Sequence, residues 1–416
     1  MDKLKFSNIT KDDKGRVNIS EEKMKSYVKF GNYNSFPEEL IYLYNNSSIH
    51  NTCVNAIVDG IVGEGLTSTP EYVIDKANST GESWNDIFKK VAQDYKLYGG
   101  FALEIIYNKS RTRIAEVYHI DFSWLRAKEK NYRGQIPGYY ISDEWAQNYR
   151  YGQAPVDEFP YLPVYNPSKK DVEAKQIYVY NPYRPGQKYY PLPDYVGALR
   201  VIDLDTEVDN FHINNIKNGL APSLMVTTFT NANEEEREAI ERMLQLQYSG
   251  TNNAGSLMYI DVDSPENAPV VTPIPQNGAD GYYTNINDMV TQKILTAHRI
   301  TSPMILGIKT EGQLGGRQET IDAYLLLVNT VIRPYQQDIL QCFEDLIEMM
   351  HPGIETSVGV QQLKLYENGE EEVDVVTSID AEVGEDAELE TEIETADREA
   401  SMDVYPQGTI TEYPTL

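Results

Sequence analysis

The segment "SPMILGIKTEGQLGGRQET", residues 302–320, separates two stretches of apolar residues with helical spacing. In residues 286–297 and again in residues 321–332, apolar side chains recur three and four positions apart, which predicts a helix on each side. The segment itself contains four glycines: Gly307, Gly312, Gly315 and Gly316. Because glycine adopts backbone conformations that other residues avoid, we expect a flexible loop with these glycines as its hinges.

The helix that follows the loop is expected to be long. Its pattern starts near Arg317 and extends to about residue 350, with Pro334 inside it. Proline has no amide hydrogen, and its ring clashes with the carbonyl group of the preceding turn. We therefore expect the helix to kink or to end at Pro334.

The chain before the loop alternates between helical and strand patterns. Two apolar-faced helices are expected within residues 36–61, a third from Ser83 to Gly99, and two more at residues 197–217 and 282–300. The stretches "FALEIIYN" and "IAEVYHID" are typical of strands joined by a short turn, and "SLMYIDV" and "PVVTPI" are also expected to form strands. The pattern predicts an α+β protein.

Residues 132–195 differ in character from the rest. They contain 13 tyrosines, and nine prolines fall between positions 137 and 193. So many prolines exclude a single helix or a central sheet, and short strands and turns are expected instead. The tyrosines either pack inside a loop-rich domain or subunit contact, or bind a sugar or another ligand.

The composition indicates a folded, acidic protein. Of its 416 residues, 41% are hydrophobic, which is enough for a core, and the only two cysteines, Cys53 and Cys342, lie too far apart for a paired motif. The N-terminus lacks the apolar region of a signal peptide, so we expect a soluble intracellular product. The net charge is −28, and residues 367–416 contribute 17 acidic residues and one basic residue. This balance argues against a strongly basic DNA-binding domain, and the acidic tail is expected to be disordered alone.

Catalytic and metal-binding motifs are not found in the sequence. The five histidines form no HExxH motif, and no GxSxG, Walker A lysine or GxGxxG is present. His119 and Asp121 are expected on one strand face, where a structural histidine is favoured over a catalytic one. The loop stretch "GQLGGR" lacks the GK[ST] that grips phosphate. The sequence therefore favours a non-enzyme with no cofactor and no metal.

Four elements in a fixed order resemble the portal proteins of tailed bacteriophages, most of all the HK97-type family. The first is a helix that ends on an NGxxP motif, the second a hairpin with NAG, the third a turn with Pro and Leu-Gly, and the fourth a long helix interrupted before a proline. The matching residues are Asn218, Gly219 and Pro222, then Asn253, Ala254 and Gly255, then Pro303, Leu306 and Gly307, and finally Pro334. The resemblance covers roughly residues 30–350.

The resemblance implies a portal fold, with an α/β wing, two stem helices, a small α/β clip, a glycine-rich tunnel loop and a long kinked helix. Mapped onto this chain, the plan gives an N-terminal arm 1–25, a wing 26–196, a first stem helix 197–219, a clip 220–277, a second stem helix 280–302, a tunnel loop 303–316, a long helix 317–350 and an acidic crown or tail 351–416. The Tyr/Pro-rich residues 132–195 and the tail depart most from the family pattern.

The resemblance implies that the protein assembles into a ring, expected to be a dodecamer, at one vertex of a viral capsid. Double-stranded DNA would enter and leave through its channel without sequence specificity. The implied partners are the terminase large subunit, the major capsid or scaffold protein and a head-tail adaptor, with no membrane. The protein would be made in the host cytoplasm and reside in the virion.

The resemblance also implies roles for individual residues. Lys309, Gln313 and Arg317 would contact DNA from the tunnel loop, with the four glycines as hinges and Pro334 as the helix kink. Glu234, Glu235, Arg237 and Arg242 would lie on the clip surface that docks terminase or adaptor. Two alternatives stay open: another connector or ring component of a virus-like particle or gene-transfer element, and a polymer-binding enzyme that uses the tyrosine-rich middle. The enzyme predicts a monomer, whereas the other two predict a ring.

Overall fold

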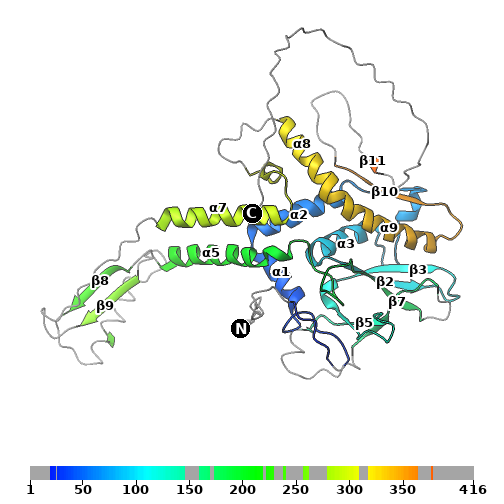
Figure 1. The fold of residues 1–416 in the computed structure, drawn as a ribbon, viewed down its shortest axis with the longest axis horizontal. Helices are drawn as coiled ribbons and strands as arrows, with labels where there is room; N and C mark the ends of the chain where they lie inside the picture. Colours follow the sequence, from blue (N-terminus) through cyan, green and yellow to red (C-terminus); the bar gives the residue numbers. More distant parts are fainter. Residues whose placement is uncertain are drawn as a thin grey trace, which may run out of the picture. The chain divides into compact units, whose positions relative to one another are not determined.

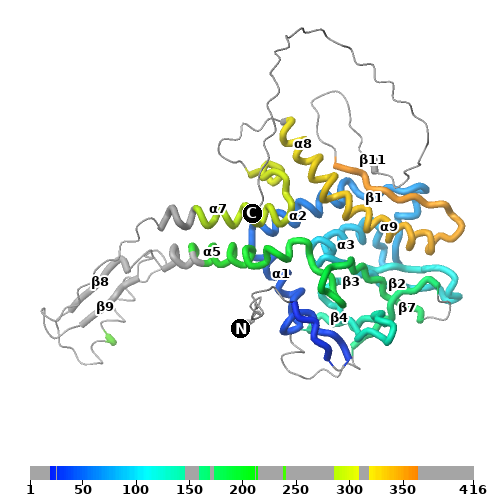
Figure 2. Tube along the Cα trace, in the orientation of Figure 1, coloured from blue at the N-terminus to red at the C-terminus, as the bar shows by residue number. Residues whose placement is uncertain are grey.

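The computed structural model describes residues 19–24, 26–145, 159–168, 173–218, 222–228, 238–239, 256–261, 279–308, 317–363 and 376–377. All of them belong to one compact unit, Met1–Ile379. Figure 1 shows an α/β part, built from the blue to green segments and from the orange helix, and a pair of helices, α5 and α7, that run side by side. Figure 2 follows the same path of the chain by colour.

The α-helices follow the sequence patterns closely. They are α1 (Phe36–Asn46), α2 (Ser48–Val62), α3 (Trp84–Tyr98), α5 (Leu199–Asn218), α7 (Ala279–Ala297), α8 (Arg317–Leu327) and α9 (Arg333–Met350). The short 3-10 helices are η1 (Glu71–Ile74), η2 (Phe122–Trp124), η4 (Val196–Ala198) and η6 (Pro303–Leu306). None of the helices in the described residues is long and apolar enough to cross a membrane.

Local sequence signals fix the ends of α3. The Ser83 hydroxyl accepts a hydrogen bond from the Asp86 amide at 3.2 Å, and the Asp86 carboxylate accepts one from the Ser83 amide at 2.9 Å. This reciprocal capping box pairs two amides that would otherwise lack partners at the helix start. At the other end Gly99 adopts a left-handed conformation with φ +82°, which glycine accepts without steric penalty.

The described strands form four small sheets. Three are antiparallel, with strand orders β1-β10-β11, β3-β2-β7 and β4-β5-β6, and β8 pairs with β9 in parallel. The strands are β1 (Gly65–Thr69), β2 (Phe101–Tyr107), β3 (Ile114–Ile120), β4 (Leu125–Ala127), β5 (Gly138–Ile141), β6 (Tyr161–Pro163), β7 (Lys175–Tyr180), β8 (Pro222–Thr228), β9 (Ser256–Asp261), β10 (Ser357–Gln361) and β11 (Val376–Thr377). The Tyr/Pro-rich region thus contributes short strands, as expected.

The hydrophobic core lies between α2, α3, α9 and the sheets. Phe343 of α9 packs edge-on against Trp84 of α3 at a ring-centroid distance of 4.9 Å, and it also contacts Phe88 at 6.0 Å. All three side chains are fully buried. Burying an aromatic side chain of this size contributes roughly 2–3 kcal/mol, so this contact holds α9 onto the N-terminal helices.

From the sequence, the long helix is expected either to kink or to end at Pro334. The helix does not end there. It continues from α8 into α9 through a π-helical turn, η7 (Val328–Ile332), directly before Pro334. The Arg333 amide donates to the Val328 carbonyl, five residues earlier. Since proline cannot donate to the carbonyl four residues before it, the wider turn places the irregularity beside the missing hydrogen bond.

Segments from both ends of the family plan contact the α/β part. Residues 357–361, assigned to the crown, form β10 and pair with β1, in the register Gly65 opposite Gln361. Part of the expected arm is built into the α/β part, because the Glu21 carboxylate accepts hydrogen bonds from three successive amides at 2.8–3.0 Å, those of residues 188–190. His119 pairs with Asp94 at 2.9 Å rather than with Asp121, since Asp121 has left the strand and caps η2.

Candidate functional site

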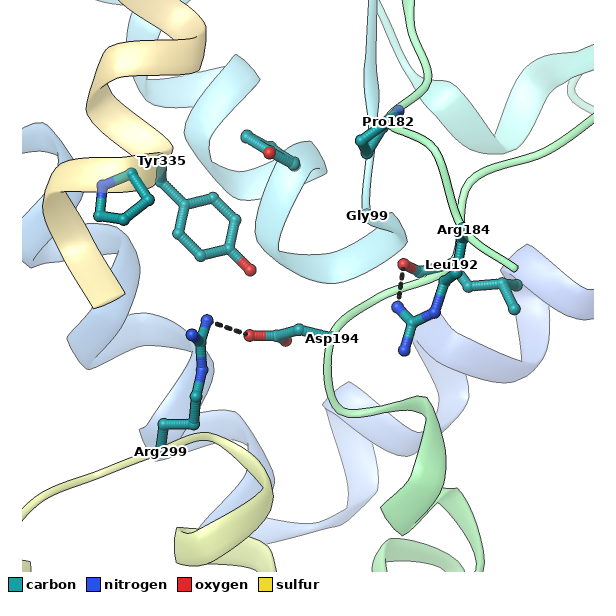
Figure 3. Close-up of a pocket in the computed structure, with 9 residues that line it drawn as sticks. Gly99, Pro182, Arg184, Leu192, Asp194, Arg299 and Tyr335 are labelled. Atoms are coloured by element: carbon teal, nitrogen blue, oxygen red, sulfur yellow. Dashed lines mark hydrogen bonds and ion pairs between the residues drawn. The ribbon is translucent and has the colours of Figure 1, made fainter. Parts of the chain in front are cut away.

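Segments that lie far apart in the sequence converge where α5 and α7 meet the α/β part. Lys96 lies near the end of α3, Asp194 shortly before α5, and Arg299 just after α7. The Lys96 ammonium contacts one Asp194 carboxylate oxygen at 2.8 Å, and the Arg299 guanidinium contacts the other at 3.1 Å. We refer to these three residues as the ion cluster. Figure 3 shows Arg299 reaching Asp194, with Tyr335 of α9 beside them.

Burial of the ion cluster removes charged groups from water, which shifts the pKa values of Lys96 and Asp194. The Lys96 side chain is 0% exposed and that of Asp194 is 23% exposed. Burial lowers the pKa of Lys96, and the attraction of Asp194 opposes that change. Burial pushes the pKa of Asp194 upward, but Lys96 and Arg299 outweigh it and hold this pKa below its usual value. The carboxylate is therefore charged, and it joins the end of α3 to the segments that enter α5 and leave α7.

Aromatic rings enclose the buried ammonium group. The Lys96 Nζ atom lies 5.6 Å from the ring centroid of Tyr195 and 5.7 Å from that of Tyr335. The Tyr195 hydroxyl donates to the Leu97 carbonyl at 2.7 Å. A cation near aromatic faces is partly compensated for its lost hydration. The rings thus help a lysine to remain in the protein interior.

A buried histidine pair lies next to the ion cluster. Nδ1 of His50, on α2, lies 2.9 Å from Nε2 of His298, which follows α7. The ring of Tyr195 lies 4.7 Å from that of His50 and 4.8 Å from that of His298. Burial, reinforced by the charge of Lys96, lowers the pKa of His50 to about 3 and that of His298 well below its usual value. Both rings are therefore neutral at physiological pH.

We expect the histidine pair to make the stability depend on pH. In the unfolded chain both histidines bind a proton near pH 6.5, but in the folded chain they stay neutral until far lower pH. The free energy of unfolding is therefore highest above pH 6.5. It falls as the pH drops from 6.5 towards about 3, because only the unfolded chain binds protons at these two histidines. Asp94 acts in the opposite direction below pH 6, because burial raises its pKa to about 6.

The variant His298→Gln isolates the contribution of His298 to the pH dependence of the free energy of unfolding. Below pH 6.5, the wild-type free energy of unfolding should fall more steeply than that of the variant, by up to about 1.4 kcal/mol per pH unit for one histidine. Urea denaturation between pH 5 and 8 measures both curves. Above pH 7.5 the two slopes should agree, which serves as the internal control. Equal slopes below pH 6.5 would contradict the argument.

A cavity of about 220 Å³ opens beside the ion cluster (Figure 3). Its lining comes from Tyr95, Gly99, Pro182, Arg184, Leu192, Asp194, Arg299, Pro334 and Tyr335. The Arg184 guanidinium donates to the backbone carbonyls of Leu192 and Pro193 at 2.8 and 2.6 Å, which fixes the segment that carries Asp194. The cavity therefore borders Pro334 of the long helix on one side and the entry into α5 on the other.

Few of the residues selected from sequence fall in the described part of the chain. Gly307 has φ +76° and caps η6, and Pro334 lies next to the π-helical turn. Arg317 is the first residue of α8, and its side chain is not described. Outside the described residues lie Lys309, Gly312, Gln313, Gly315, Gly316, Glu234, Glu235, Arg237 and Arg242.

Sequence reasoning missed the ion cluster and the histidine pair. Lys96 follows Tyr95, on the apolar face of a helical pattern, and a charge there is a signal of a buried partner. Nothing in the sequence identifies that partner, since Asp194 lies 98 residues further on in the Tyr/Pro-rich region. Among the described residues, no group of three or more His, Cys, Asp or Glu side chains is placed to hold a metal ion.

Comparisons with known proteins identify the class. The family model for phage portal proteins matches residues 64–382, most of the chain, so the chain belongs to the phage portal protein family. A curated relative, the probable portal protein of Haemophilus phage HP1 (strain HP1c1), is 30% identical over 130 residues. That match spans 30% of this chain and 37% of the relative, so the chain covers well under half of the relative's length.

Solved structures with the same fold come from gene transfer agent particles. A chain from the virion of a native gene transfer agent particle has a TM-score of 0.52 and 12% sequence identity, and the match covers 77% of this chain and 82% of that chain. A chain from the neck of an empty particle, computed with C6 symmetry, also has a TM-score of 0.52, with 13% identity and coverage of 77% and 83%. At these identities the similarity shows the fold alone.

Proposed function

We propose that this protein is the subunit of a ring-shaped portal at one vertex of a viral capsid, through which double-stranded DNA is packaged and later ejected. The observation that carries the proposal is the match of residues 64–382 to the phage portal family, together with a fold shared with chains of gene transfer agent particles. In this role the protein is a structural part of the virion and not an enzyme. Terminase, a head-tail adaptor and a capsid or scaffold protein are its proposed partners, and no membrane is involved.

Exposed apolar side chains support assembly into a ring of identical copies, for which we propose twelve. They lie on the helix pair and on α8, and they are Leu204, Ile213, Met289, Leu325 and Leu326. The similar neck chain belongs to a particle region computed with C6 symmetry, and twelve copies are compatible with a sixfold axis. Apolar groups on the outer faces of helices gain by contact with a second copy, because association removes them from water.

The double variant Leu325→Asp/Leu326→Asp tests the ring. Two carboxylates in an interface between copies would be desolvated without partners, so we expect the ring to be lost or weakened at least about tenfold, which corresponds to 1.4 kcal/mol. Mass photometry and negative-stain imaging of the full-length chain measure the assembly state. In the single chain Leu326 is 53% exposed and Leu325 37% exposed, so the fold of the chain should survive the double variant, which urea denaturation of the unassembled chain checks.

The matched control is Asn329→Asp, which adds a carboxylate at an exposed position of η7 and should leave the ring intact. A wild-type chain that stays monomeric across protein concentration, across salt concentration and with capsid partners present would overturn the proposal. The third and least favoured candidate, a polymer-binding enzyme that uses the tyrosine-rich middle, would then be tested by glycan screening.

We propose that Lys309, Gln313 and Arg317 contact DNA in the channel, with Gly307, Gly312, Gly315 and Gly316 as hinges. A ring repeats each positive charge around its axis, while sparse contacts keep the DNA free to move. We expect Lys309→Ala/Arg317→Ala to assemble normally and to package less DNA, measured as nuclease-protected DNA per particle. Unchanged packaging would exclude direct charge contact by these two residues.

For the surface that docks terminase or adaptor, we propose Glu234, Glu235, Arg237 and Arg242. Their charges suit a polar contact that forms with one partner during packaging and is later exchanged for another. Pull-down of the terminase large subunit by the charge-reversed variant Arg237→Glu/Arg242→Glu, compared with the wild-type ring, tests this surface. Undiminished capture would move the docking site elsewhere.

A second candidate is a ring component of a gene-transfer element, and the similarity to gene transfer agent chains favours it. Both candidates share the ring and the DNA channel, and they differ in the cargo. Sequencing of the DNA inside purified particles distinguishes them, since a phage carries its own genome and a gene-transfer element carries fragments of host DNA.

A further inference from the structure

The long helix contains one residue more than a regular α-helix would need between its two ends. In η7 the hydrogen bonds span five residues instead of four, as seen in the bond from the Arg333 amide to the Val328 carbonyl. Conversion of this turn to α-helix would release one residue. Either α8 or α9 would then have to move along the helix path by one position.

α9 is fixed in its position. Ile332, the last residue of η7 and the N-cap of α9, is fully buried against Gly60 of α2, where even a methyl group on Gly60 would come within 2.4 Å of the Ile332 side chain. The Gln336 side-chain amide donates to the carbonyls of Gly60 and Ile61 at 3.3 and 2.9 Å. These contacts depend on the identity of the α9 residues, so any shift must occur in α8.

α8 is not fixed in the same way, because the end of α8 that adjoins η7 is apolar on all sides. The stretch from Tyr324 to Val328 reads YLLLV. Leu327 and Val328 are 1% and 4% exposed, whereas Leu325 and Leu326 are 37% and 53% exposed. A shift by one position would place Val328 in the buried site of Leu327, and Leu327 in the exposed site of Leu326. At the buried site of Leu327 one aliphatic side chain replaces another, so the change in buried apolar area at this site is small.

The polar contacts of the described part of α8 also leave its register open. The Thr301 hydroxyl donates to the backbone carbonyl of Ala323 at 2.6 Å, a partner that any residue in that position would supply. The hydrogen bond from Gln318 to Asp322, at 2.9 Å, lies within the helix and moves with it. In the first turns of α8, the side chains of Gln318, Glu319 and Asp322 are exposed. Rotation of the helix therefore takes few buried contacts away from these three side chains.

We propose that α8 occupies two registers, which differ by one residue and interconvert through the π-helical turn η7. In the second register η7 becomes α-helical, and α8 moves about 1.5 Å along its axis and turns by about 100°. The start of α8 at Arg317 is then displaced relative to α9. Under the proposed function, on which this last step rests, copies of the ring could present α8 in either position.

Thiol labelling of single-cysteine variants of the full-length chain tests the two registers. Leu327→Cys is buried in the observed register and exposed in the second one, whereas Ile332→Cys is buried in both. If the second register holds about 1% of the molecules, Leu327→Cys should label roughly 100-fold more slowly than exposed Leu326→Cys. Ile332→Cys requires a larger opening and should label at least about tenfold more slowly again. Cys53 and Cys342 are buried, and the unaltered chain measures their background.

Deletion of Asn329 supplies the decisive comparison, because it removes the surplus residue at an exposed position. In this background, labelling of Leu327→Cys should slow to the rate of Ile332→Cys. Equal labelling of the two variants with Asn329 present, or undiminished labelling of Leu327→Cys without it, would overturn the proposal.

Hydrogen exchange on the unaltered chain tests the same idea without any substitution. Amides of residues 326–331 should exchange faster than those of residues 339–347, and uniform protection across both ranges would contradict two registers. All of these measurements can be made on unassembled chains. A chain that forms no ring even with capsid partners present, but that still shows fast exchange in residues 326–331, would therefore refute the proposed function and leave the two registers standing.

Discussion

Asp194→Ala is expected to lower the free energy of unfolding by about 3–5 kcal/mol, the range found when one partner of a buried ion pair is removed. The reason lies in what remains: Lys96 keeps a fully buried ammonium group, and Arg299 loses its carboxylate. The cost is mainly the desolvation of an uncompensated charge rather than the loss of one hydrogen bond. Urea denaturation of the unassembled chain at pH 7.5 measures this difference.

A second ion pair in the same protein provides the matched control. Lys175 and Glu104 lie on neighbouring strands at 3.0 Å, and the Lys175 side chain is largely exposed. Since water and salt screen such pairs, Glu104→Ala should lower the unfolding free energy by only about 0.2–1 kcal/mol. Similar losses for the two variants would mean that burial does not control the energetics of the ion cluster.

The sequence predicted the helices well because their signals are local. The helix from Ser83 to Gly99 was predictable from a serine cap at its start, from apolar residues at a period near 3.6, and from a glycine at its end that tolerates positive φ. α1, α2, α5, α7 and α9 carry equally local patterns. The strands β2 and β3 were also predictable, since a short turn joins them directly.

Pairings between distant segments could not be predicted in this way. β1 and β10 are about 290 residues apart in sequence, and each is short, so neither pattern reveals its partner. β8 pairs in parallel with β9, and a parallel pair has no hairpin turn to mark it. The form of the irregularity just before Pro334 depends on packing, since Ile332 before the proline and Gln336 after it hold this part of the helix in place.

The same limit applies to the candidate site. The ion cluster and the histidine pair join residues from α2, α3, the segment before α5 and the segment after α7, and no motif spacing connects them. The resemblance to portal proteins implies roles for the glycine-bearing loop and the clip. Most of those residues lie outside the described part of the chain, whereas the ion cluster lies where the helix pair joins the α/β part.

Gly99→Ala is expected to destabilise the same junction from the backbone side, by about 2–5 kcal/mol. A Cβ atom at Gly99 would lie 2.3 Å from the Leu192 carbonyl oxygen and 2.7 Å from the Pro193 nitrogen, distances that backbone atoms cannot accommodate without moving. The left-handed conformation adds about 1–2 kcal/mol for any residue with a side chain, and relief of the clash adds typically 1–3 kcal/mol. The displaced segment carries Asp194, so the ion pair with Lys96 should also lengthen.

Gly81→Ala separates the two contributions. Gly81 also has a positive φ, +93°, but nothing lies within 4 Å of the position that its Cβ would occupy. This variant should therefore show only the conformational penalty of about 1–2 kcal/mol, and the difference between the two variants reports the close contact at Leu192. Urea denaturation of both proteins measures that difference. If Gly99→Ala were no more destabilising than Gly81→Ala, the backbone of the segment before Asp194 would move at little cost. The ion cluster would then not hold α3 rigidly against the helix pair.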